Sequence, residues 1–218
     1  MKKRLMSFQE TQVLLNTFQI AQPPQILVED MAQAIAAAES VGYPLVLKLV
    51  SSAATHKSDA NLVVLNIQDR HELLAQFELL RQRGAHLPDE GFLLQHMLKG
   101  GVETLAGTIW DAQFGHAIVF GTGGTLVEWL NDTSLRIPPL NEWQIEQMVS
   151  ETRVASLLDG YRGQPACDRI ALVECLSSLA RLVQTEGTRL LSMDINPLIV
   201  MPRGAFAVDT RIYVREEE

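Results

Sequence analysis

The chain has 218 residues, 47% of them hydrophobic, and a formal net charge of -8. This length and composition are sufficient for one large core or two smaller ones without metal or disulfide staples. The negative charge and the lack of Lys and Arg clusters interleaved with aromatic residues argue against nucleic acid as a partner. No apolar run approaches the ~20 residues that span a bilayer, and Met1 to Arg4 precede a polar helix rather than a signal segment. We therefore expect a cytoplasmic protein that binds no membrane.

The first half of the chain predicts alternating helices and strands. Ser7 and Glu10 form a capping box, and Asp30 and Asp69 are N-cap residues, so each marks the start of a helix. Apolar, β-branched runs between these helices are typical of strands. The expected elements are helices 8–18, 30–42 and 69–84 and strands 45–50, 62–67 and 92–97.

The second half predicts two hairpins separated by helices. A glycine cluster, Gly121 to Gly124, follows the first hairpin. The expected elements are strands 103–110 and 116–121, helices 142–158 and 168–186, and strands 191–200 and 205–213. The whole pattern indicates an α+β fold.

The final hairpin carries the clearest chemistry. If Pro202 and Arg203 are its turn residues, counting outward places Asn196 opposite Asp209. Facing side chains of this kind have Cβ atoms only ~5 Å apart. Asp194 projects from the same face as Asn196, so one patch carries three oxygen-bearing side chains. Mg2+ prefers such oxygen ligands and takes one or two of them from protein, which predicts a magnesium site.

The same pattern also has a plainer interpretation. The patch could be the polar solvent face of an edge hairpin, and Pro197 agrees with that, because proline is found on edge strands or at bulges. Spacing alone does not decide between the two interpretations.

Lys48 stands inside the apolar run 45–50. A lysine in such a strand either reaches solvent from an exposed face or meets an anion, for which a nucleotide phosphate is suitable. Both alternatives are compatible with the sequence.

The loop after this strand contains His56 beside Lys57 and Asp59. A neutral imidazole can attack phosphorus and leave again, so a histidine can carry phosphoryl groups reversibly. A neighbouring cation would steady the charge, and a carboxylate would fix the tautomer. A solvated bystander is the alternative. The glycine cluster Gly121 to Gly124 also has two interpretations: a loop whose backbone approaches phosphate closely, or a plain turn. It is not a P-loop, because no Lys-Thr pair follows it.

Seven segments occur in an order that resembles the ATP-grasp module of ADP-forming acetate-CoA ligases, in the succinyl-CoA synthetase-like superfamily. The resemblance covers nearly the whole chain. It implies an ATP-grasp fold with a smaller lobe at 1–95, a larger lobe at 96–218 and a nucleotide cleft between them. The segments are 42–48 (GYPLVLK), 56–59 (HKSD), 111–115, 120–128, Asp132 with Arg136 and Pro139-Leu140, 158–163, and 194–198 (DINPL).

The resemblance also implies roles for individual residues. His56 matches the β-subunit histidine that accepts phosphate and passes it to ADP. Lys48 would contact phosphate, and the hinge residues Gln95, Met97 and Leu98 would contact adenine. Glu103 would contact the ribose or the hinge, and Asn196 and Asp209 would bind Mg2+.

The implied activity is that of an acid-thiol ligase that uses ATP/ADP and Mg2+. Acyl-CoA, ADP and phosphate would interconvert with a carboxylic acid, CoA and ATP. In the family, a CoA-binding α subunit handles the acyl group, so the resemblance implies a separate partner chain in a hetero-oligomer.

One segment departs from the family pattern. Paired glycines usually follow the histidine motif, whereas this chain has Ala60-Asn61-Leu62, and leucine adds a Cβ where the backbone would approach phosphate. A catalytically impaired nucleotide-sensing or scaffold module is therefore an alternative function. A third possibility is an ATP-grasp ligase that forms an acyl phosphate directly in its own cleft.

Overall fold

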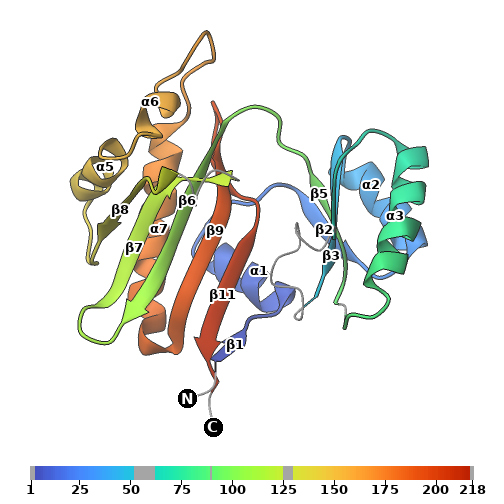
Figure 1. The fold of residues 1–218 in the computed structure, drawn as a ribbon, viewed down its shortest axis with the longest axis horizontal. Coiled ribbons are helices and arrows are strands. Elements are labelled where there is room, and N and C mark those ends of the chain that lie inside the picture. Colours follow the sequence, from blue (N-terminus) through green and yellow to red (C-terminus); the bar gives the residue numbers. More distant parts are fainter. Residues whose placement is uncertain (1–2, 52–61, 89, 125–129, 217–218) are drawn as a thin grey trace. The chain divides into compact units, whose positions relative to one another are not determined.

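The computed structural model describes residues 3–51, 62–88, 90–124 and 130–216. The chain forms two compact units, one from Pro23–Lys99 and the other from Met1–Gln22 with Gly100–Glu218. Each unit combines helices with an antiparallel sheet, which confirms the α+β class (Figure 1).

The smaller unit, Pro23–Lys99, contains a four-stranded sheet with the order β2-β5-β3-β4. The side chains of Asp30 and Asp69 accept hydrogen bonds from backbone amides in the first turns of α2 and α3, so both predicted N-caps are confirmed. Strand β2 was not predicted. The elements are β2 (Gln25–Val28), α2 (Met31–Val41), β3 (Leu45–Val50), β4 (Val63–Ile67), α3 (Arg70–Gly84) and β5 (Gly91–His96).

Helices α2 and α3 cover one face of this sheet (Figure 1). Leu45, Leu47 and Leu49 of β3 share a buried core with Leu73 and Phe77 of α3. Successive residues of a strand point to opposite faces, so the even-numbered residues of β3 project from the face without these helices.

The larger unit contains a seven-stranded sheet with the order β1-β11-β9-β6-β7-β8, and β10 also pairs with β9. Helix α7 packs on this sheet, where Leu176 and Leu179 join Ile195 and Leu198 of β9 in one core (Figure 1). The elements are β1 (Lys3–Leu5), α1 (Phe8–Thr17), β6 (Val102–Asp111), β7 (Gly115–Thr122), β8 (Thr133–Arg136), α5 (Glu142–Ser150), α6 (Ala155–Leu158), α7 (Arg169–Glu186), a 3-10 turn (Gly187–Arg189), β9 (Leu190–Val200), β10 (Ala205–Ala207) and β11 (Thr210–Arg215).

The N-terminal segment belongs to the larger unit, which corrects the expected lobes 1–95 and 96–218. Strand β1 pairs antiparallel with β11, and Leu14 and Leu15 of α1 are buried in the larger core. The partner of β1 lies at the far end of the sequence, so local patterns could not reveal the pairing. The second boundary follows Lys99 rather than Gln95.

The helix expected at 142–158 is interrupted. Helices α5 and α6 are separated because the backbone N–H groups of Arg153 and Val154 donate to the Asp132 carboxylate at 2.9 to 3.2 Å instead of continuing the helix. None of the helices within residues 3–51, 62–88, 90–124 and 130–216 is both long and apolar enough to cross a membrane.

Candidate functional site

Asn196 and Asp209 face each other in the final hairpin, as the sequence predicted. The N–H of Asn196 donates to the carbonyl of Asp209 at 3.0 Å. Nearer the turn, the N–H of Met201 donates to the carbonyl of Gly204 at 2.9 Å. These two bonds confirm the predicted register.

Strand β9 is central, so the interpretation as an edge hairpin is wrong: β6 pairs with one side and β10 and β11 with the other. Thr104 of β6 pairs with Leu198, whereas Ala106, two residues on, pairs with Ile195, three residues back. Strand β9 therefore carries one extra residue beside Pro197. This irregularity explains how a proline is accommodated in a central strand.

Asp194 lies on the face of β9 that is turned away from the core, because its neighbours Met193 and Ile195 are buried. Arg211 pairs with it across the strands. Although the Asp194 carboxylate reaches solvent, desolvation by surrounding protein atoms raises its pKa; Arg211 opposes this shift and Asp209 adds to it. A bound cation would favour the ionised form of this carboxylate.

The glycine segment Gly123-Gly124 joins Glu103 to Asn196. The N–H of Gly124 donates to Oδ1 of Asn196 at 3.0 Å, and the N–H of Gly123 donates to the carbonyl of Glu103 at 3.1 Å. A Cβ added to Gly124 would lie 2.1 Å from Oε2 of Glu103, so the carboxylate lies directly against this glycine. The larger unit thus brings three predicted functional segments together. The sequence marked the glycine cluster but did not indicate its contact with Asn196.

The donor groups on this face suit Mg2+. No three His, Cys, Asp or Glu side chains gather as a metal site in the described parts of the chain. The candidate site instead offers the amide oxygen of Asn196 and the carboxylate of Asp209, with Asp194 close by. Mg2+ commonly takes one or two protein ligands and completes its octahedron with water and phosphate oxygens.

Lys48 and Gln95 project from the same face of the smaller sheet, opposite the helices. Lys48 pairs with Leu93 and Gln95 pairs with Val46, and paired residues share a face. Lys48 is only 6% exposed, so the alternative of an ordinary solvent-exposed lysine is wrong. The buried Gln95 amide donates to Oε1 of Gln25 at 2.6 Å, which fixes its orientation.

The predicted hinge residues Met97 and Leu98 follow directly after β5, where the chain leaves the smaller unit. The N–H of Met97 donates to the carbonyl of Pro44 at 2.9 Å. His56 lies outside the described residues. The roles of all of these residues toward a nucleotide remain predictions.

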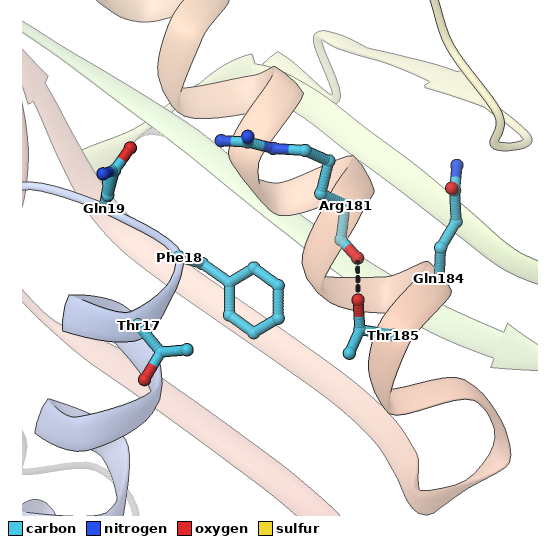
Figure 2. A pocket seen from close by; sticks show the side chains of 6 residues that line it. All are labelled: Thr17, Phe18, Gln19, Arg181, Gln184 and Thr185. Carbon is cyan, nitrogen blue, oxygen red and sulfur yellow. Dashed lines mark hydrogen bonds between the residues drawn. The ribbon is translucent and has the colours of Figure 1, made fainter.

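A separate concave region of about 410 Å3 lies in the larger unit between the end of α1 and the last turns of α7. Its hydroxyl groups already donate to carbonyls of their own helices: Thr17 donates to Val13. Thr185 donates to Arg181, as Figure 2 shows. We do not place a nucleotide there, because none of the described candidate residues lines it. The lining residues are Thr17, Phe18, Gln19, Arg181, Gln184 and Thr185.

Two relatives match this chain over nearly all of its length. The β subunit of acetate-CoA ligase (ADP-forming) II from Pyrococcus furiosus is 36% identical over 212 residues, which cover 94% of this chain and 90% of that relative. Acetate-CoA ligase (ADP-forming) I from Archaeoglobus fulgidus is 37% identical over 207 residues, which cover 94% of this chain and 30% of that longer relative.

A solved structure of similar fold is the dinucleotide-forming acetyl-coenzyme A synthetase 1 of Ca. Korarchaeum cryptofilum. It has a TM-score of 0.85 and 31% identity, and the match covers 97% of this chain and 93% of that chain. It is a complex with coenzyme A and Mg-AMPPCP in which a phosphohistidine segment points towards the nucleotide-binding site. The family model of the ATP-grasp domain matches residues 1–214, so the chain belongs to the ATP-grasp family.

Proposed function

We propose that this chain is the nucleotide-binding β part of an ADP-forming acyl-CoA synthetase. In the overall reaction, acyl-CoA, ADP and phosphate interconvert with a carboxylic acid, CoA and ATP. The observation that carries the proposal is the pairing of Asn196 with Asp209 beside Gly124 in a chain of the ATP-grasp family.

Asn196 and Asp209 would hold Mg2+, which when bound supplies positive charge to the nucleotide phosphates. Asp194 adds a carboxylate on the same face, where a bound cation would favour its ionised form against the desolvation that raises its pKa. Glu103, held against Gly124, would bind the ribose or the hinge.

The smaller unit would bind the rest of the nucleotide. Lys48, a buried cation, would contact phosphate, where a charge-assisted bond is stronger than a neutral one. The segment from Gln95 through Met97 to Leu98 would contact adenine, with the Gln95 side chain held by Gln25.

His56 would carry the phosphoryl group. In the direction of ATP synthesis, a terminal oxygen of ADP attacks the phosphorus of phosphorylated His56 and forms the new P–O bond. The P–N bond breaks, and its electron pair returns to the imidazole nitrogen. Lys48 would steady the phosphate charge during this transfer.

The proposal requires a CoA-binding α part that forms the acyl phosphate and delivers its phosphoryl group to His56. The name of the Pyrococcus furiosus relative, a β subunit, supports a separate partner chain and hence a hetero-oligomer. The Archaeoglobus fulgidus relative is longer than the matched region, so the other arrangement to test is one in which the α and β parts belong to one polypeptide.

A second candidate function is a nucleotide sensor or scaffold that no longer transfers phosphate. The residues Ala60-Asn61-Leu62, which replace the family's paired glycines, favour it. Such a module would bind nucleotide without forming phosphohistidine.

Incubation with γ-32P-labelled ATP and Mg2+ tests the proposal. We expect acid-labile label on the wild-type chain, loss of that label in His56→Ala, and retention in the control His71→Ala, an exposed histidine of α3. Tight ADP binding without label in the wild type would support the sensor. Label that persists in His56→Ala would contradict the role of this histidine.

A further inference from the structure

The side-chain oxygen of Asn196 accepts a hydrogen bond from the glycine segment that follows β7. We propose that the backbone N–H of Gly124 is a positioning group that turns Oδ1 of Asn196 toward the candidate metal site. The contact is a hydrogen bond of 3.0 Å. This inference rests on the proposed function, because it concerns the metal ligand named there.

A backbone N–H can only donate, so the atom of the Asn196 side chain that faces Gly124 must be the oxygen. The two ends of an asparagine amide have nearly the same shape, and only the hydrogen-bond network distinguishes them. Mg2+ binds the oxygen and is repelled by the NH2 group. A carbonyl oxygen has two lone pairs, so Oδ1 can accept from Gly124 and still bind a metal.

Glycine is required at position 124 for two reasons. Its φ of +73° lies in the left-handed region, and a Cβ there would meet Oε2 of Glu103 at 2.1 Å. At Gly123 the constraint is steric, since a Cβ on it would lie 2.2 Å from the carbonyl oxygen of Thr104. The segment can therefore lie flat on the start of β6 only because both residues are glycine.

Strand pairing in the sheet holds Gly124 close to Asn196. Thr122 at the end of β7 pairs with Thr104 of β6, and Thr104 pairs with Leu198 of β9. Gly124 therefore reaches Asn196 across β6 from a rigid base. A partner that orients a metal ligand in this way typically changes metal affinity by ~10- to 100-fold when it is lost.

The test measures Mn2+ binding to the full chain by electron paramagnetic resonance, with and without ADP. We expect Gly124→Ala to weaken Mn2+ binding by about 10-fold. Gly163→Ala is the matched control, because its φ is +84° and nothing lies within 4 Å of the added Cβ. Equal Mn2+ affinities in the two folded variants would overturn the inference, whereas a wild-type chain that binds no Mn2+ would overturn the proposed function itself.

A rescue experiment separates orientation from general distortion. In Asn196→Asp, both terminal atoms are oxygens, so the orientation no longer matters. We expect Gly124→Ala to cost at most about 3-fold in the N196D background, against about 10-fold in the wild type. Equal costs in both backgrounds would contradict a role in orientation.

A second measurement does not depend on the folding of Gly124→Ala. In the wild type, the Gly124 amide proton should exchange slowly with solvent, because it is bonded to Oδ1. In Asn196→Ala, its exchange should be at least about 10-fold faster in nuclear magnetic resonance of 15N-glycine-labelled protein. Identical exchange in the two proteins would also overturn the inference.

Discussion

Asn196 lies directly opposite Asp209, and their backbones are joined by a hydrogen bond of 3.0 Å. If both side chains hold one metal ion, either substitution removes a ligand from the same ion. We predict that Asn196→Ala and Asp209→Asn each weaken Mn2+ binding by ~10-fold or more, and that the double variant falls short of the product of the two effects. The measurement is a Mn2+ titration in the presence of ADP.

The control for this experiment is Glu174→Gln, which removes an exposed carboxylate of α7. Its Mn2+ affinity should equal that of the wild type. If Asp209→Asn behaves like Glu174→Gln, Asp209 is not a ligand.

Lys48 provides a test in the smaller unit. Replacing it with methionine keeps most of the side-chain volume and removes the charge. A lost charge-assisted phosphate contact of ~1.5–3 kcal/mol predicts ADP binding weaker by roughly 10- to 100-fold. The dissociation constants of ADP and AMP, measured by calorimetry, should diverge less in Lys48→Met than in the wild type. Lys3→Met, which changes an exposed lysine of the larger unit, should alter neither constant. Unchanged ADP affinity in Lys48→Met would refute the phosphate contact.

Glu10 gives a prediction of pH dependence. Its carboxylate accepts bonds from Arg4 at 2.6 and 2.8 Å, and this pairing lowers the pKa of Glu10 from 4.5 to about 2. A lowered carboxyl pKa stabilises the fold at pH values above 4.5, and this stabilisation is lost as the pH falls toward about 2. Each side chain is 39% exposed, so we expect the pair to contribute only ~0.5–1 kcal/mol at neutral pH.

Glu10→Gln tests this, because glutamine at the third helical position preserves the capping box and removes the charge. Its melting temperature should lie below that of the wild type at neutral pH, and the two should converge as the pH falls below 4.5. Arg4→Gln should show the same convergence. A difference that stays constant with pH would show that the ion pair is not its cause.

Asp132 connects the end of β7 to the start of α6. Its carboxylate accepts bonds from the Thr122 hydroxyl at 2.6 Å and from the amides of Arg153 and Val154 at 2.9 to 3.2 Å. Asp132→Ala should cost ~2–3 kcal/mol in the free energy of unfolding, because these donors lose a charged acceptor. Asp159→Ala, which removes an acid that is 65% exposed, should cost under ~1 kcal/mol. Urea unfolding of both variants measures these costs. Equal losses of unfolding free energy in the two variants would contradict the connecting role of Asp132.

The sequence was sufficient wherever the determining interactions are local. The register of Asn196 and Asp209 followed from counting outward from a two-residue turn, and the caps at Ser7 and Asp30 followed from short-range side-chain bonds. The pairing of β1 with β11 depends on partners at opposite ends of the chain, and the bond from Gly124 to Asn196 joins residues far apart in sequence. Neither leaves a signal in local periodicity.

The short strand β8 escaped prediction for a different reason. Its four residues are too few to show a period, and Ser134 and Arg136 are polar. Both bond to Glu151, beyond the last turn of α5. The polar residues of β8 are therefore explained by a tertiary contact, which the local sequence does not reveal.

Strands β2 and β5 run side by side, with Gln25 paired to Gln95, and the N–H of His96 donates to the carbonyl of Pro24 at 2.8 Å. The smaller unit is thus an insertion in the sequence of the larger one, and the segments by which the chain enters and leaves it are hydrogen-bonded to each other at Pro24 and His96. Such an insertion can be excised as one continuous stretch, or circularly permuted through a short linker, without stretching either end. The residues proposed to bind the base and the phosphates could then be studied apart from the proposed metal ligands.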